Sequence, residues 1–405
     1  MKYWFYLEPY TFIFGGVQGK IIYNTLNGNI INVPPAALPL INELEKDGSG
    51  YTVELEEEFL ENEIIRSFIK EIREKFSGDI LSNETHKPFV CKPILDLLND
   101  PRKLLAEERR TLTSDLLSYL HEVNLYLDSN CTYHCTHCTG YCKQFPWCTT
   151  FKHITTSLSI EDYENLFGFL STVGVKQLNL FGGDILHNSL LDPLIDIANS
   201  FSIKSNIYIN YLNLKPFIDD KLKIINSKYI VLARAEDVNL QTILQFTNKI
   251  ESIEWKVSVA SIKEYLMVEE TFEKLPVKVE ICPYYDGNNY DFFFDNVFVD
   301  LEEIASSVHS KRDIFVKQVL NTNFFGKLTI LPNGDVYANL NRESLGNLKE
   351  HSLNELVYKE IEHGNTWLNT RNEGTCAQCI YKYLCPSISN YELVLQRMNT
   401  CHIYK

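Results

Sequence analysis

Long apolar runs are missing from this sequence, and their absence limits where the protein works. Across its 405 residues, no stretch approaches the 18 uncharged apolar residues that a transmembrane helix needs. The aromatic start at residues 3–5 is interrupted by Glu8 and Pro9, which argues against a secretory signal peptide. We therefore expect a cytoplasmic protein without a membrane partner.

Positive charge is also scarce, because 38 Lys and Arg face 53 Asp and Glu and give a formal net charge of −15. Nucleic-acid binding needs a basic surface that neutralises phosphates. No stretch of the chain is dominated by Lys or Arg, so no nucleic-acid partner is expected. The hydrophobic content of 45% suffices for two or three folded domains.

Cysteine, by contrast, is plentiful and clustered. The chain has 11 cysteines, and in a protein without an export signal they indicate metal or redox chemistry rather than disulfides. Cys131, Cys135 and Cys138 follow one strand-like run with C-x3-C-x2-C spacing. Three thiolates can hold three corners of an iron–sulfur cube. One iron would then lack a protein ligand, and an open position is typical of a reactive site.

A second cysteine set lies near the C-terminus. Cys376 and Cys379 form a C-x2-C pair, Cys385 follows after five residues, and Cys401 is more distant. Four thiolates make a closed site that suits either a [4Fe-4S] cluster or zinc. The spacing therefore predicts a second metal centre in residues 311–405.

The middle of the chain, residues 123–310, alternates strand-like with helix-like runs. The strand-like runs are at 124–127, 175–181, 205–211, 228–233, 253–259 and 276–282. Helix-like segments at 159–172, 187–200, 213–225, 237–249 and 261–272 fill the gaps. This order predicts an α/β fold with a parallel sheet curled into a partial, TIM-like (β/α)6 barrel. Chemistry in such folds belongs at the C-terminal ends of strands, where the first cysteine set lies.

The N-terminal residues 1–80 form a smaller predicted unit. Asn27-Gly28 between two β-rich runs indicates a hairpin, and apolar spacing from Phe59 to Ile72 indicates a helix. We expect a small α+β module that binds or docks rather than catalyses. Residues 81–122 are predicted to be a helical linker in which Cys91 is a small buried side chain.

After the second predicted strand come Gly182, Gly183 and Asp184. Paired glycines let the backbone approach a ligand, and the adjacent carboxylate can accept from an ammonium group. This turn lies at the same end of the predicted sheet as the first cysteine set. A plain connection between strand and helix is the alternative.

The first cysteine set, His137 just before its last member, and this Gly-Gly-acid turn together resemble the radical S-adenosylmethionine superfamily. The resemblance implies a [4Fe-4S] cluster whose fourth iron binds S-adenosylmethionine, and a 5′-deoxyadenosyl radical that abstracts hydrogen. It also implies that Gly182, Gly183 and Asp184 contact the methionine ammonium. By the same resemblance, His137 lies near adenine and Asn210 contacts the ribose.

Several residues depart from the pattern of that superfamily. Asp184 is one methylene shorter than the usual glutamate, Thr132 stands where asparagine is common, and residues 231–234 lack the common serine. These differences concern the cofactor pocket more than the cluster. Relatives that have lost catalysis therefore supply an alternative, in which the protein escorts a peptide to another enzyme.

The C-terminal cysteines are similar to the outer-cluster ligands of the SPASM domain found in peptide-modifying radical enzymes. Asn339 and Ser389 stand where ligands of an inner cluster would be expected, so one auxiliary [4Fe-4S] cluster is implied. Residues 1–80 resemble the PqqD-like, winged-helix-like element that holds the leader of a ribosomally made precursor peptide. An external electron donor is the other implied partner.

The resemblance as a whole implies an enzyme that modifies a precursor peptide, with the aromatic segment 283–294 lining the substrate channel. Two zinc sites in a structural protein are a further alternative. The remaining cysteines are treated as accessory: Cys142 and Cys148 as structural or extra ligands, and Cys282 as a core residue facing the barrel mouth.

Overall fold

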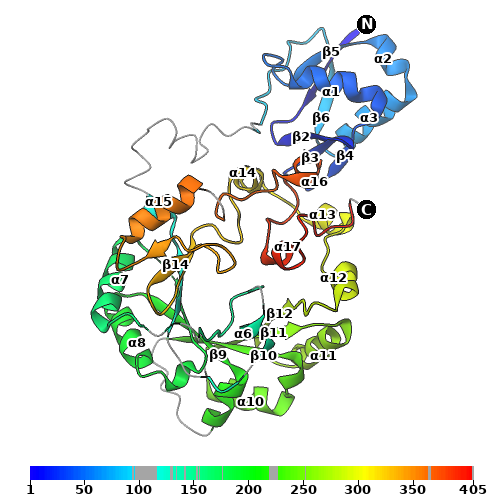
Figure 1. Cartoon of the computed structure of the whole chain (residues 1–405). Helices are drawn as coiled ribbons and strands as arrows, with labels where there is room; N and C mark the ends of the chain where they lie inside the picture. The colour runs from blue at the N-terminus through cyan, green and yellow to red at the C-terminus, as the bar shows by residue number, and fades with distance from the viewer. Residues whose placement is uncertain are drawn as a thin grey trace.

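The computed structural model describes residues 1–93, 95, 116–127, 131–133, 135–140, 143–151, 154, 156–175, 177–218, 227–250, 252–363 and 366–403. The end of the helix predicted for 213–225, most of the predicted linker helix, and Cys142 lie outside these residues. Figure 1 shows the arrangement of the elements. No described helix combines the length and apolarity needed to cross a bilayer.

The predicted parallel sheet is present. Its strands are β7 (Glu122–Tyr126), β8 (Gln177–Phe181), β9 (Lys204–Asn210), β10 (Lys228–Arg234), β11 (Ile253–Val259) and β12 (Lys278–Pro283). Each pairs in parallel with its sequence neighbours. Strands that are joined by helical crossovers run parallel, so the alternating pattern correctly predicted both the strands and their order.

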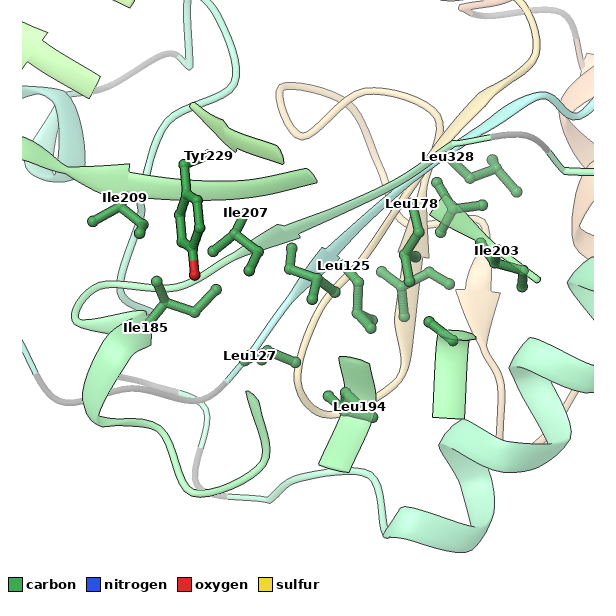
Figure 2. Close-up of a cluster of buried hydrophobic side chains, with 14 of the residues drawn as sticks. Leu125, Leu127, Leu178, Ile185, Leu194, Ile203, Ile207, Ile209, Tyr229 and Leu328 are labelled. Atoms are coloured by element: carbon green, nitrogen blue, oxygen red, sulfur yellow. The ribbon is translucent and has the colours of Figure 1, made fainter. Parts of the chain in front are cut away.

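Helices connect these strands and cover the outside of the sheet (Figure 1). They are α7 (Ile160–Thr172), α8 (Leu191–Ser200), α9 (Tyr211–Leu214), α10 (Leu240–Lys249) and α11 (Ile262–Glu273). Ser159 begins α7 with a capping box that also uses Asp162, which satisfies free N–H groups of the first turn. The core between helices and sheet is aliphatic, as Figure 2 shows for Leu125, Leu178 and Ile207 among others.

The sheet extends beyond the predicted strands. β13 (Lys327–Ile330) pairs in parallel with β7, and β14 (Asp335–Tyr337) and β15 (Gly346–Asn347) continue from it in antiparallel order. The pair Asn333-Gly334, which is the same hairpin signal in the sequence as Asn27-Gly28, forms the turn between antiparallel β13 and β14, with Gly334 at a φ of 93°. In the described residues β12 and β15 are the two ends of an open nine-stranded sheet, so closure of the expected partial barrel is not observed.

The remaining helices lie after β12. They are α12 (Tyr290–Asn296), α13 (Leu301–Ser306), α14 (Lys311–Val319), α15 (Leu353–His363), α16 (Gly374–Ala377) and α17 (Asn390–Val394). α16 carries the first cysteine of the C-terminal set, and α17 begins at a capping box made by Ser389 and Glu392.

The N-terminal module contains two small sheets, with strand orders β5-β1-β6 and β2-β3-β4. The strands are β1 (Lys2–Leu7), β2 (Thr11–Gly16), β3 (Gly19–Asn24), β4 (Ile30–Asn32), β5 (Thr52–Glu56) and β6 (Gly78–Ser82). The helices are α1 (Leu38–Glu45), α2 (Glu57–Glu61) and α3 (Glu63–Glu74). The hairpin predicted at Asn27-Gly28 is confirmed by the antiparallel pairing of β3 and β4.

Residues 86–93 correct one sequence prediction. They have no regular secondary structure, whereas a helical linker was expected. Cys91 is exposed, so the prediction of a buried side chain is wrong. A segment without a helix or strand has no repeating face to bury, which explains the exposure of its thiol.

Both faces of the β2–β4 sheet are covered. Alternation along the strands turns Ile13 and Ile22 toward the helices of the N-terminal module. The other face, with Phe14 and Tyr23, shares a core with Cys379 and its neighbours in the C-terminal region. The N-terminal module is therefore packed directly against the second cysteine set.

Gly16 lies at the closest point of this contact. A Cβ at this position would be 2.1 Å from the carbonyl oxygen of Gln378, and the adjacent Val17 N–H donates to the same oxygen at 3.1 Å. Gly15, one residue earlier, is the natural comparison, because a Cβ there would meet only the Lys20 side chain at 3.6 Å.

We predict that Gly16→Ala lowers the free energy of unfolding by about 1–3 kcal/mol, because the new methyl group overpacks a contact with rigid backbone. Gly15→Ala should change it by less than about 0.5 kcal/mol. Thermal and denaturant unfolding of both variants tests this. Equal stabilities for the two variants would mean that the contact with Gln378 is loose.

Candidate functional site

The first cysteine set lies on the loop after β7. Cys135 is buried and precedes the short helix α6 (Thr136–Thr139), while Cys131 and Cys138 are partly exposed. The pKa of Cys135 is raised, first by burial and then by the neighbouring Cys138, with a smaller contribution from Cys131. The three thiols are thus close enough to interact electrostatically. A donor set made only of sulfur suits an iron–sulfur cluster or zinc.

Arg234, at the end of β10, acts on this loop from the side. Its guanidinium opposes the rise in the pKa of Cys135 and helps to lower the pKa of His137. Asp237 holds it through bonds of 2.8 Å to Nε and 3.1 Å to Nη2. β10, the fourth strand of the parallel sheet, therefore supplies a fixed cation where the radical S-adenosylmethionine superfamily commonly has a serine.

His137 is enclosed by aromatic rings. Its ring centroid is 4.3 Å from that of Trp147, in a stacked arrangement, and 4.1 Å from that of Tyr284. Burial lowers the pKa of His137 to about 3, so the ring is neutral at physiological pH. Its Nε2 is buried without a protein hydrogen-bond partner.

The Gly-Gly-Asp turn follows β8. Gly182 and Gly183 are buried, and Asp184 uses Oδ2 to bind Nδ1 of His187 at 2.8 Å. The other carboxylate oxygen, Oδ1, is buried and has no hydrogen-bond partner. A buried carboxylate oxygen without a partner is costly, and an ammonium group from a ligand would satisfy it. These residues therefore fit the amino group of S-adenosylmethionine.

Asn213, on the short helix α9, connects the Gly-Gly-Asp turn to the cysteine loop. Its Nδ2 donates to the Gly183 carbonyl oxygen at 2.7 Å and lies 3.8 Å from Sγ of Cys131. The side chain is only 5% exposed. Sequence reasoning missed this residue, because no motif marks an asparagine in the turn after β9.

Asn210, predicted to contact the ribose, is engaged within the protein. Its Oδ1 accepts from Leu212 N–H at 2.9 Å and caps α9, while Nδ2 lies 3.5 Å from Sγ of Cys148. A ribose contact would compete with one of these bonds.

Cys148 lies closer to the first cysteine set than the sequence indicated. It is 3% exposed, and Sγ of Cys138 lies 3.3 Å from its carbonyl oxygen. Burial raises the pKa of Cys148, and the three thiols of the set add to that rise. The spacing alone could not show that a cysteine ten residues past the set returns to it.

The C-terminal set comes together around one cavity. Cys376, Cys379, Cys385 and Cys401 all line it, with Arg371 and Lys382. Burial raises the pKa of Cys385 to about 12, with Arg371 opposing the rise and the three other thiols adding to it. The chemistry of this all-sulfur donor set suits an iron–sulfur cluster or zinc. Across the described residues, however, no three Cys, His, Asp or Glu side chains converge tightly enough for a single ion such as zinc.

A cavity of about 560 Å³ lies between the sheet and the C-terminal region. Four of its charged lining residues pair within the wall: Lys256 binds Glu280 at 2.7 Å, and Lys327 lies 3.7 Å from Glu122. Lys143 also lines the cavity and donates to the carbonyl oxygens of His137 and Cys138. Amide side chains contribute much of the rest of the lining, which includes Asn124, Gln144, Gln177, Asn323, Asn339 and Asn390. Such a wall suits a polar ligand.

Cys282 and the aromatic segment 283–294 relate differently to this cavity. Cys282 lines it, and burial raises the pKa of its thiol to about 12, with Glu280 adding to the rise. Of the segment, only Pro283 lines the cavity, while Tyr284 packs on His137. The segment thus supports the cysteine loop, and its role as a channel wall stays a prediction.

Comparison with solved structures identifies a shared architecture. The crystal structure of Streptococcus suis SuiB bound to the precursor peptide SuiA has 14% sequence identity to this chain, a TM-score of 0.51, and coverage of 98% of each chain. The chain has the fold of SuiB. The structure of SuiB bound to S-adenosylmethionine, at 14% identity, has a TM-score of 0.42 over 99% of this chain and 98% of that one.

A structure of native anSMEcpe with bound AdoMet is also similar, at 12% identity and a TM-score of 0.41 over 65% of this chain and 88% of that one. No protein-family model matches the chain, and no curated protein matches it either. The fold of SuiB is accordingly what these comparisons show, and the chemistry has to be argued from the site.

We predict that Asn213→Ala destabilises the protein by about 1–3 kcal/mol, since it leaves the Gly183 carbonyl oxygen buried and unpaired. It should also weaken binding of S-adenosylmethionine, because the turn is no longer tied to the cysteine loop. Unfolding and calorimetric titration of the anaerobically reconstituted protein measure the two effects.

Asn296→Ala is the matched control for this prediction. It removes an exposed amide that donates to the Phe292 carbonyl oxygen at 3.0 Å, so the stability should change by less than about 0.5 kcal/mol. An Asn213→Ala variant with unaltered stability and cofactor affinity would contradict the assigned link.

Proposed function

We propose that this protein is a radical S-adenosylmethionine enzyme that modifies a ribosomally made precursor peptide. The observation that carries the proposal is the unpartnered Oδ1 of Asp184, which lies on the turn that Asn213 ties to Cys131. A cluster with one open iron needs three thiol ligands, and an amino-acid ligand on that iron needs a carboxylate for its amino group. Both are present here at the ends of neighbouring strands.

In this proposal Cys131, Cys135 and Cys138 hold a [4Fe-4S] cluster. Held there with S-adenosylmethionine, and given one electron by an external donor, such a cluster would supply a 5′-deoxyadenosyl radical for hydrogen abstraction from the peptide. Asp184 accepts the methionine ammonium, and the buried, neutral His137 holds the loop through its contacts with Trp147 and Tyr284. Cys135 and His137 are buried, whereas Cys131 and Cys138 stay partly exposed and leave room for a ligand to approach.

The peptide core would enter the 560 Å³ cavity. Lys143 follows the cysteine loop, donates to the Cys138 carbonyl oxygen at 2.6 Å, and lines the cavity. The cavity therefore reaches the loop that holds the radical chemistry. Its amide-rich wall favours a polar peptide segment.

The leader of the precursor would bind the edge of β6. A groove of about 780 Å³ separates α3 from this strand and is lined by Ile69, Arg73 and Ile80. The Ile80 N–H points away from β1, because it bonds the Asp79 side chain at 2.7 Å. By contrast, β2–β4 is covered on both faces, and Val90 N–H donates to Gly50 beside β5. An added strand along β6 is the simplest way to bind an extended peptide.

Anaerobic reconstitution with iron and sulfide tests the enzyme proposal. We expect loaded, reduced protein to convert S-adenosylmethionine to 5′-deoxyadenosine, and Cys135→Ala to lose this activity by at least about 100-fold, because an essential ligand is missing. Cys142→Ala should keep it, as should Cys91→Ala, which removes an exposed thiol.

The same assay tests the alternative of a peptide escort that has lost catalysis. This alternative is favoured by Asn339, whose side chain bonds Asn390 at 2.7 Å and Asn341 N–H at 2.9 Å, as suits a position without a cluster. Well-loaded protein that forms no 5′-deoxyadenosine, with or without peptide, would establish it. A protein purified anaerobically with zinc alone would instead favour two structural zinc sites.

Leader binding can be blocked at β6 without removing the N-terminal module. We predict that Ile80→Pro weakens binding of a precursor peptide by at least 10-fold, since proline cannot donate to an added strand. Ile80→Val keeps the N–H and should bind normally. Fluorescence anisotropy with a labelled candidate precursor peptide measures both, and equal affinities would exclude β6 as the docking edge.

A further inference from the structure

The C-terminal cysteine cavity has an unusual distribution of charge. Besides four cysteines, the described residues that line it include two cations, Arg371 and Lys382, and no carboxylate. Four thiolates around a cluster leave a net negative charge, so nearby cations favour addition of another electron.

Arg371 is fixed against this cavity by three contacts. Its Nη1 lies 3.7 Å from Sγ of Cys376, its Nε donates to the Pro386 carbonyl oxygen at 2.6 Å, and its Nη2 donates to Oε1 of Glu392 at 2.8 Å. The side chain is 10% exposed. The guanidinium therefore acts on the thiol with little screening by water.

Glu392 is the matching negative charge. It is 2% exposed, and its Oε2 accepts from the Ser389 N–H at 2.9 Å and from the Ser389 hydroxyl at 2.6 Å. Glu392 thus has donors on both carboxylate oxygens, Arg371 on Oε1 and Ser389 on Oε2. It offsets part of the field of Arg371, so the two side chains act on the cysteines in opposite directions.

The short helix α17 places this pair beside the substrate cavity. Tyr391, the neighbour of Glu392, lines that cavity and donates to the Pro283 carbonyl oxygen at 2.8 Å. A single helical turn thus separates the cavity from the charge pair on the cysteines.

We propose that the Arg371–Glu392 pair sets the reduction potential of a cluster held by Cys376, Cys379, Cys385 and Cys401. Arg371 raises the potential through its contact with Cys376, and Glu392 restrains that rise. The auxiliary site is therefore a redox centre and not only a structural staple. This inference rests on the proposed function in requiring an iron–sulfur cluster at these cysteines.

The test uses the full chain with the first set replaced by alanine at Cys131, Cys135 and Cys138, so that only the C-terminal set is loaded. The midpoint potential of the anaerobically reconstituted protein is measured by redox titration followed by electron paramagnetic resonance. We expect Arg371→Gln to shift the midpoint to more negative values and Glu392→Gln to shift it to more positive ones. Arg371→Lys should fall between Arg371→Gln and the parent.

Lys359→Gln is the control, because its amine also binds a carbonyl oxygen, that of Leu345 at 2.6 Å, but does not line the cavity. Its midpoint should equal that of the parent. If removing the buried guanidinium prevents folding, Glu392→Gln and Arg371→Lys decide the question. Identical midpoints for these variants would overturn the inference while leaving the proposed function intact.

Zinc without iron at the C-terminal set would overturn the inference for a different reason. In that case, formation of 5′-deoxyadenosine by the chain with its first set intact shows separately whether the enzyme proposal stands.

Discussion

The candidate cofactor site depends on a stack of aromatic rings across three neighbouring strands. Tyr126 ends β7, Phe181 ends β8, and Tyr208 lies near the end of β9; the ring centroids are 4.9 Å apart in the first pair and 4.1 Å in the second. Offset-stacked rings at this spacing stabilise one relative position of the strands. Because the cysteine loop, the Gly-Gly-Asp turn and the Asn213 turn begin at these ends, the stack fixes how they face one another.

Much of this arrangement could be predicted from the sequence. Alternation of strand-like and helix-like runs gave the parallel order, and Asn-Gly pairs gave two hairpins, because both signals arise from neighbouring residues. The parallel pairing of β13 with β7 left no such signal. About 200 residues separate the two strands, and a parallel pair has no tight turn between its strands that a sequence pattern could mark. The sheet was therefore predicted with too few strands, while the expected partial barrel stays a prediction because the pairing shows an open sheet.

The residues of the candidate site also fall into those that the sequence reveals and those that only the structure reveals. The two cysteine sets and the Gly-Gly-Asp turn are visible as spacing, whereas Asn213 and Arg371 become relevant only through three-dimensional contacts. Cys148 is intermediate: it is near the first set in sequence, but only the folded loop brings its thiol beside Asn210. Residues that bind a ligand often belong to a sequence motif. Residues that only position the ligand-binding side chains seldom do.

The core shared by Phe14, Tyr23 and Cys379 has a consequence for how the protein is made. Residues 11–24 leave the ribosome long before residues 376–385, and until then one apolar face of the β2–β4 sheet has nothing to cover it. Domains generally fold as they emerge, and exposed apolar surface promotes aggregation. Here one face of an early sheet is completed only by a much later segment, so a nascent chain exposes an aggregation-prone apolar face until residues 376–385 emerge.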